Sequence, residues 1–327
     1  MRKFSRRQAI GMPLLTLAGT AMKPVFGVAS MYPAQTITVV VPFAAGGMTD
    51  ILGRQFAKTL QQDVHQAVIV DNRLGAGGIV GADKVAKAHS DGYTLLITTT
   101  AHVVNPAITK NLPYDTAKDF EPVALLARTP NVLMVNPANP AKNLQEFLDY
   151  ARKKGGAFYG SSGTGGTTHL SGELLSNRTG APLIHVPYKG MALAVSALIG
   201  GQIDASFVDA LSAVQYIRSG TLRAIAVSTK DRSPALPSVP TISEQGVPGY
   251  ETEIWIGLYA PKGTPQEIIK QLNGLANKSM GEQSFKAMLL DRGTTNGGMS
   301  VEDFRRYVSS ELAKWQAIVA TAKIQIE

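Results

Sequence analysis

The sequence predicts an α/β protein in which two lobes face each other across a cleft. From residue 37 onward, short β-branched segments alternate with segments whose apolar residues have helical spacing. Turn-rich patches at 129–130 and 233–240 interrupt this alternation. Hydrophobic residues make up 44% and charged residues 17% of the 327-residue chain, which is typical of a globular protein of one large or two ordinary domains.

The first lobe begins with strand–helix alternation. Strands are predicted at 37–41, 68–70 and 94–98, and helices at 50–61, 80–88 and 105–109. Alternation at this spacing favours a parallel sheet with helices on both faces. Ligands of such sheets bind at the carboxyl ends of the strands, where the strand-to-helix loops converge.

The second lobe follows two short strands, predicted at 123–127 and 131–135 around Thr129-Pro130. The alternation then restarts, with helices predicted at 144–153, 167–178, 191–200 and 211–219, and strands at 157–160, 184–186, 205–208 and 224–227. A strand at 254–260 precedes residues 265–327, which are helical in period almost throughout. The simplest packing of this order assigns 30–128 and 254–327 to lobe 1 and 129–253 to lobe 2.

The first 29 residues are predicted to be a cleaved secretory signal. A basic start is followed by a short apolar stretch, Ala9 to Met22, and by small residues that allow cleavage after Ala29 or Ser30. Ser5-Arg6-Arg7 has the twin-arginine pattern, so both the general and the twin-arginine export routes remain open. We expect a periplasmic protein.

The net charge of +8 does not indicate a nucleic-acid partner. Residues 1–30 contain five basic residues and no acid, so much of the excess charge lies in the export signal. The longest Lys/Arg run that follows is the triplet Arg152-Lys153-Lys154, whereas a phosphate-tracking surface gathers many such residues.

Two Gly-rich loops carry the strongest functional signal. Residues 43–50 and 159–169 each join a predicted strand to a predicted helix, and their glycines let backbone N–H groups approach a ligand. A helix start offers unpaired donors and partial positive charge, which favour an anion. Two such starts facing one cleft could hold a small acid. In the first loop, Thr49 or Asp50 acting only as a helix cap is an equal alternative. The loop at 72–78 is as easily a structural turn as a ligand site.

Further candidates follow other predicted strands, where cleft residues come from: Thr98, Thr99, Asn105, Tyr188 and Asp209. Helix capping or core packing is an equally good reading of each. Trp255 is placed either at the cleft mouth or, by default, in the core.

Enzyme, cofactor and metal motifs are not found. The sequence has no cysteine, and its five histidines show no pair at metal-ligand spacing. Gly160-Ser161-Ser162-Gly163-Thr164 breaks the nucleophile-elbow pattern at its last position, and the Gly-rich loops break the dinucleotide fingerprint. We therefore expect no cofactor and no metal, and retain His169 only as a hydrogen-bonding residue of the cleft.

Four motifs together resemble the Bug-type substrate-binding proteins of tripartite tricarboxylate transporters, in order and spacing across nearly the whole mature chain. They are Pro42-Phe43-x-x-Gly46-Gly47-x-x-Asp50, Asp71-Asn72-Arg73-x-Gly75-Ala76-Gly77-Gly78, Ser161-x-Gly163-x-Gly165-x-x-x-His169 and His185-Val186-Pro187-Tyr188-Lys189-Gly190.

The resemblance implies a two-lobed periplasmic binding-protein fold of type II with the ligand cleft between the lobes. It implies a monomeric receptor that traps a small carboxylic acid and delivers it to membrane permease subunits. The carried-over ligand-binding residues are Phe43, Gly46, Gly47 and Asp50 on one side, Ser161, Gly163, Thr164, Gly165, Thr168 and His169 on the other, and Asp209 after a strand. Thr99, Asn105 and Tyr188 complete the predicted site. A sensory module and a periplasmic enzyme using the same cleft are the alternatives, and the ligand itself is not identified.

Overall fold

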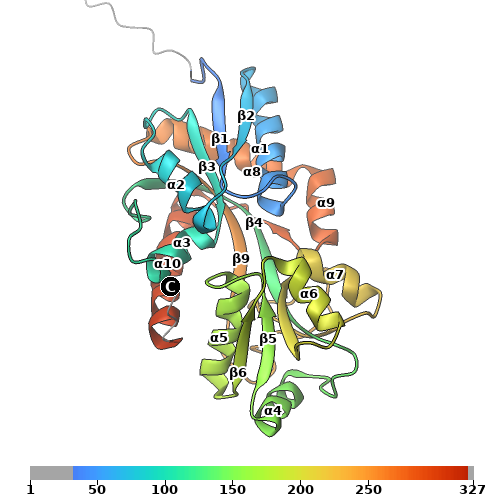
Figure 1. The fold of residues 1–327 in the computed structure, drawn as a ribbon. Coiled ribbons are helices and arrows are strands. Elements are labelled where there is room, and N and C mark those ends of the chain that lie inside the picture. Colours follow the sequence, from blue (N-terminus) through green and yellow to red (C-terminus); the bar gives the residue numbers. More distant parts are fainter. Residues whose placement is uncertain (1–31, 323–327) are drawn as a thin grey trace, which may run out of the picture. The chain divides into compact units, whose positions relative to one another are not determined.

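A computed structural model of the chain describes residues 32–322, and from Pro33 onward these form one compact unit. Its strands lie in a ten-stranded sheet with the order β2-β1-β3-β9-β4-β7-β5-β6, while β8 and β10 both pair with β4 (Figure 1). The strands are β1 (Ile37–Val41), β2 (Val68–Asn72), β3 (Thr94–Thr99), β4 (Phe120–Val135), β5 (Ala157–Ser161), β6 (Leu183–Pro187), β7 (Ala205–Asp209), β8 (Arg223–Val227), β9 (Glu253–Pro261) and β10 (Thr295–Asn296).

The helices alternate with these strands along the chain over most of its length, as predicted. They are α1 (Met48–Val64), α2 (Ile79–Ala86), α3 (Ala101–Ile108), α4 (Leu144–Lys154), α5 (Thr167–Thr179), α6 (Met191–Ile199), α7 (Ala210–Arg218), α8 (Gln266–Gly281), α9 (Gln283–Asp291) and α10 (Val301–Ala322), with a 3₁₀ turn η1 (Ala76–Gly78) before α2. The predicted alternation of strands and helices is thus confirmed.

Two parallel blocks make up the ends of the sheet. β2, β1 and β3 pair in parallel at one end, and β6, β5 and β7 at the other. The long strands β4 and β9 join the blocks by antiparallel pairing. Within β4, residues 120–130 pair with β9, and residues 131–135 pair with β7 and β8. One strand therefore belongs to both blocks.

The prediction of two short strands around Thr129-Pro130 is wrong, because β4 is continuous from Phe120 to Val135. Proline lacks the N–H that an interior strand position needs. Pro130 is tolerated because it lies where pairing with β9 ends and pairing with β7 begins.

The prediction of helix throughout the C-terminal region is also corrected. Between α9 and α10 the chain forms β10, whose Thr295 and Asn296 pair with Arg128 and Ala127 of β4. A two-residue strand has no periodicity of its own, so only its partner reveals it.

The C-terminal helix α10 packs against α3, β4 and α5, and so contacts elements of both blocks. Trp255 of β9 and Trp315 of α10 are fully buried. Both indole Nε1–H groups donate to Glu311 Oε2, at 2.9 and 3.0 Å. Trp255 is thus a core residue, and the shared carboxylate ties β9 to α10.

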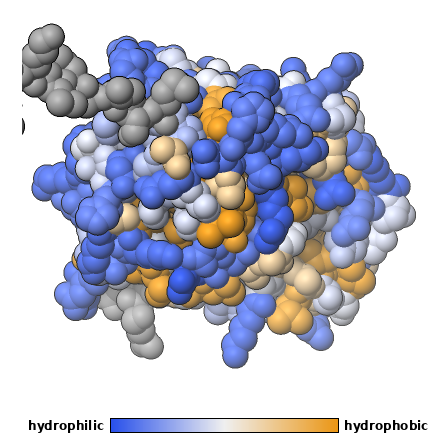
Figure 2. Space-filling model, turned by 90° about the horizontal axis from the view of Figure 1, so that it is seen from above, coloured by the Kyte–Doolittle hydropathy of each residue, from blue (hydrophilic) through white to orange (hydrophobic). Residues whose placement is uncertain are grey.

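On the face seen from above in Figure 2, hydrophilic residues predominate and apolar residues form patches between them. The exposed large apolar side chains come from several elements, with two of them in α6: Ile69, Leu74, Val80, Phe158, Ile184, Leu193 and Ile199. Among residues 32–322, no helix combines the length and apolar character needed to cross a membrane. The predicted export signal at 1–29 lies outside the described residues.

Candidate functional site

A cavity of about 630 Å³ lies between the two parallel blocks. Its volume falls within the range of small-molecule sites. One side is formed by residues 162–167, the loop and first residue of α5. The other side comes from several elements: Phe43, Ala76, Gly77, Ile79, Thr99, Thr100, Ala101, Asn105, Ile108, Thr109 and Ile254.

The α5 side presents backbone donors to the cavity. Gly166 is the N-cap of α5, and no side chain caps this helix start. The N–H groups of Thr164 and Thr167 form no hydrogen bond within the described structure. The first N–H groups of a helix have no partner inside the helix, and together with its dipole they attract an anion. This side of the cavity is therefore suited to a carboxylate.

Side chains behind the loop hold it in shape. Ser162 N–H donates to Thr168 Oγ1 at 3.2 Å, and Gly163 N–H donates to Ser161 Oγ at 3.1 Å. Gly165 N–H donates to His169 Nδ1 at 3.0 Å. Ser161, Thr168 and His169 are each at most 5% exposed and do not line the cavity. The structure thus places Gly163, Thr164 and Gly165 at the cavity and these three predicted residues behind them.

His169 also stacks on His185, with ring centroids 3.7 Å apart. Burial lowers the pKa of His185 to about 4, the charge of His169 adds to this effect, and Glu173 opposes it. His185 Nε2 lies 2.7 Å from Ser161 Oγ. This pair has the spacing of a nucleophile and its base. Ser161 is, however, fully buried, and its hydroxyl also bonds Gly163 O, so the pair supports the loop.

The loop before α1 has the same geometry as the loop before α5. Gly46 and Gly165 have φ of +81° and +79°, in the left-handed region that favours glycine. Gly46 N–H donates to Asp50 Oδ2 at 2.9 Å, as Gly165 N–H does to His169. Gly47 and Gly166 are the N-caps of the two helices. The two predicted loops are therefore equivalent in their backbone.

Only Phe43 of the α1 loop lines the cavity, whereas Gly46, Gly47 and Asp50 do not. The Asp50 carboxylate is 2% exposed and accepts hydrogen bonds from Gly46 N–H, Asn72 Nδ2 and Arg54 Nε. Burial raises its pKa, but these bonds, that from Arg54 above all, outweigh burial and lower it. In this structure Asp50 holds its own loop.

The wall opposite α5 is formed mainly by apolar and neutral groups. Phe43, Ile79, Ile108 and Ile254 are all half-buried and face the cavity. The α3 start contributes Thr99, as predicted, but its donors are already used: Thr99 Oγ1 accepts from Ala101 N–H, and Thr100 N–H donates to Trp255 O. Asn105 lines the cavity and donates to Gly77 O at 3.4 Å.

Tyr188 and Asp209 stand apart from the cavity lining. Tyr188 N–H donates to Ser161 O at 3.2 Å, which ties β6 to the α5 loop. Asp209 is the N-cap of α7, and its Oδ1 accepts from Ser212 N–H at 2.9 Å. Burial raises the pKa of Asp209, and the bond from Ser212 opposes this. Asp209 therefore caps α7, which is the structural role that the sequence offered as the alternative to ligand binding.

The sequence analysis did not select several cavity residues. Ala76 and Gly77 belong to the third Gly-rich loop, 72–78. The sequence indicates either a ligand site or a structural turn for this loop, so its glycines were the signal for these two residues. The apolar residues Ile79, Ile108 and Ile254 gave no such signal, because their spacing fits any core-facing residue. Their exposure to the cavity depends on how the two blocks meet.

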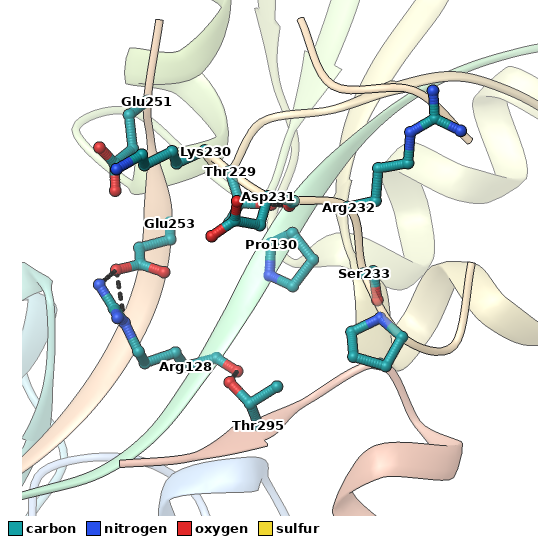
Figure 3. A pocket seen from close by; sticks show the side chains of 12 residues that line it. Arg128, Pro130, Thr229, Lys230, Asp231, Arg232, Ser233, Glu251, Glu253 and Thr295 are labelled. Atoms are coloured by element: carbon teal, nitrogen blue, oxygen red, sulfur yellow. Dashed lines mark hydrogen bonds and ion pairs between the residues drawn. The ribbon is translucent and has the colours of Figure 1, made fainter. Parts of the chain in front are cut away.

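A second cavity, of about 460 Å³, lies on the other face of β9 (Figure 3). Successive strand residues point to opposite faces, so Ile254 lines the first cavity and Glu253 the second. Glu253 is bound by Arg128 Nη2 and by Tyr307 OH, both at 2.6 Å. Burial raises the pKa of Glu253, and Arg128 opposes this. The ion pair joins β9 to β4 where the blocks meet.

Within residues 32–322, no group of three or more histidine or acidic side chains is placed to hold a metal ion. The first cavity is accordingly a site of backbone donors, hydroxyl groups and apolar side chains, and the chemistry it offers is binding of a small organic acid.

Comparison with known proteins points in the same direction. Residues 52–324 match the tripartite tricarboxylate transporter family receptor. A protein of Pseudomonas sp. strain P51, encoded in the tcbD-tcbE intergenic region, is 38% identical over 295 residues, covering 90% of this chain and 88% of the relative. Protein BugT of Bordetella pertussis is 35% identical over 294 residues, covering 89% and 90%.

Solved structures are similar over most of the chain. An R. palustris protein determined with adipate has a TM-score of 0.79 and 39% identity, covering 90% of this chain and 99% of that one. MatC from Rhodopseudomonas palustris with bound malate has a TM-score of 0.76 and 33% identity, covering 88% and 100%. The periplasmic binding protein BugD has a TM-score of 0.76 and 31% identity, covering 90% of this chain and 100% of that one, which confirms the predicted periplasmic binding-protein fold.

Proposed function

Because the chain belongs to the receptor family of tripartite tricarboxylate transporters, we propose that it is an extracytoplasmic receptor that binds a small carboxylic acid and delivers it to membrane permease subunits. The observation that carries this proposal is the cavity whose α5 side presents the uncapped helix start. The structures of relatives with adipate and malate support the same ligand class.

In the proposed complex the N–H groups of Thr164 and Thr167 receive the carboxylate. Charge-assisted hydrogen bonds of this kind are stronger than neutral ones. The hydroxyl groups of Thr164 and Thr167 lie on residues that line the same side and can add further donors. The site therefore needs no arginine to hold the anion.

We further propose that 30–128 with 254–327 and 129–253 act as two lobes that close on the ligand. Support comes from β4, whose residues 120–130 pair with β9, the neighbour of β3, and whose residues 131–135 pair with β7. Hinges are a few positions that absorb a change of backbone angle, and the partner change at Pro130 offers such a position. The Arg128–Glu253 pair lies beside it.

The receptor is proposed to be a monomer without cofactor or catalytic activity, exported to the periplasm by the signal at 1–29. The burial of Ser161 supports the noncatalytic reading of its pairing with His185, since a nucleophile must reach its substrate. A sensory role uses the same binding step, so it differs only in the partner that recognises the closed form.

The proposal is tested with the mature chain, starting at Ser30 or Met31, by calorimetry against adipate, malate, citrate, benzoate and hexanoate. We expect saturable binding of one acid per chain, without consumption of the ligand on prolonged incubation. Small-angle scattering with the bound acid should report compaction. Absence of binding to any member of the panel, in a folded protein, would overturn the proposal.

A further inference from the structure

The first cavity has an unusual lining for the site of a multiply charged ligand. None of the described residues that line it carries a charged side chain. An anion in this site must therefore be stabilised by neutral donors, namely backbone N–H, hydroxyl and amide groups. The positions of those donors decide how many carboxylates the cavity can accept.

The unpaired donors of a helix start are found on one side of the cavity. Thr164 and Thr167 contribute N–H groups without partners at the start of α5. On the opposite side, the corresponding N–H groups of Thr100 and Ala101 at the start of α3 are bonded to Trp255 O and Thr99 Oγ1. Of these two helix starts, only that of α5 has unpaired N–H groups for an anion.

Apolar side chains surround the far end. Phe43 comes from the α1 loop, Ile79 from α2, Ile108 from α3 and Ile254 from β9. A second carboxylate placed among them loses hydration without gaining a cation or a second helix start, which is unfavourable. The side chains of Thr99, Asn105 and Thr109 beside them offer only neutral groups. A methyl, methylene or aromatic group placed there removes apolar surface from water, which is favourable.

We propose that the ligand class of this receptor is monocarboxylic acids with an apolar body, bound with the carboxylate at α5 and the body against Phe43, Ile79, Ile108 and Ile254. The inference rests on the proposed function, because it takes the cavity as a carboxylate site. It assigns the apolar wall a role in rejecting dicarboxylic and tricarboxylic acids.

Matched pairs of acids test this directly. Hexanoate and adipate share a six-carbon chain and differ in a terminal methyl or carboxylate, and benzoate and terephthalate differ in the same way on a ring. In calorimetry on the mature chain, we expect the monoacid of at least one pair to bind at least tenfold more tightly than its diacid.

A charge introduced into the apolar wall should change this preference. Ile108 ends α3, where the helix dipole favours a cation, so Ile108→Lys should lower the monoacid-to-diacid affinity ratio at least tenfold. Leu193→Lys is the matched control, because Leu193 is 53% exposed on α6 and does not line the cavity. It should leave the ratio unchanged, and circular dichroism reports whether both variants fold.

The outcomes separate the two proposals. If wild type binds adipate, terephthalate, malate or citrate as tightly as or more tightly than the monoacids, the present inference is wrong and the receptor function stands. If no carboxylate of either panel binds, both proposals are wrong. An equal change of the affinity ratio in Ile108→Lys and Leu193→Lys would also overturn the assignment of the apolar wall.

Discussion

Replacing Gly166 by valine tests whether the start of α5 holds the carboxylate. Gly166 has φ −72° and ψ 161°, extended angles that any residue adopts. A Cβ there lies 3.6 Å from Gly163 O and 3.7 Å from Ser162 Oγ, which are ordinary contacts. Gly165 is unsuitable for the same test, because its φ of +79° would strain a valine and disturb the loop itself.

The expected loss of affinity follows from the donors that the new side chain obstructs. A hydrogen bond to a charged group contributes about 1.5 to 3 kcal/mol. Loss of the one from Thr167 N–H should therefore weaken binding by roughly 10- to 150-fold. As an N-cap substitution, Gly166→Val should cost about 1 kcal/mol or less of folding stability.

Gly47→Val is the matched control for this substitution. Gly47 is the N-cap of α1 with φ −75° and ψ 166°, and it does not line the cavity. It should lower the melting temperature about as much as Gly166→Val and leave the affinity within about twofold of wild type. Calorimetry with the bound acid measures both variants. Equal affinities in the two variants would refute the assignment of the anion to α5.

Three further predictions concern stability and export. Burial lowers the pKa of His102 from 6.5 to about 3, so the unfolded chain takes up a proton below pH 6.5 and stability falls toward acid pH. The His102 ring contacts those of Tyr114, Phe120 and Tyr259, so phenylalanine is a suitable replacement. In urea unfolding, His102→Phe should reduce the free energy of unfolding that is lost between pH 7 and pH 5 by about 2 kcal/mol. An unchanged loss would contradict this. Asp50→Asn should destabilise the fold by about 1 to 2 kcal/mol and change ligand affinity little, and a large affinity loss in a folded variant would place Asp50 at the ligand instead. The intact mass of the protein isolated from the periplasm should correspond to cleavage after residue 29 or 30. A stable uncut chain would contradict this prediction.

The sequence was informative about the Gly-rich loops because their geometry is local. Glycines 163, 165 and 166, after a predicted strand and before a predicted helix, predict an exposed helix start whatever the surroundings. The loop at 43–47 carries the same pattern and forms the same backbone. The carboxylate of Asp50 in that loop, however, accepts hydrogen bonds from Asn72 and Arg54. Because Asn72 lies 22 residues away in the chain, the sequence carries no periodic signal for this contact.

The pairing of Ser161 with His185 shows the same limit. The two residues lie in adjacent parallel strands, and the register that pairs Tyr159 with His185 brings the imidazole to the serine hydroxyl. Neither residue has neighbours in the sequence that suggest a pair. The burial of Ser161, which excludes a ligand from its hydroxyl, results from packing beneath the α5 loop.

The sequence by itself determined the order of strands and helices, since apolar periodicity, strand composition and glycine turns act over a few residues. Tertiary structure decided the pairing of β4 with both blocks and the short strand β10, because strand pairing depends on hydrogen bonds between distant segments. It also decided which helix start faces the cavity. The end of β3 and the loop after β5 are about 60 residues apart in the chain, and only the sheet order places apolar Ile108 and Ile254 opposite the free donors of α5.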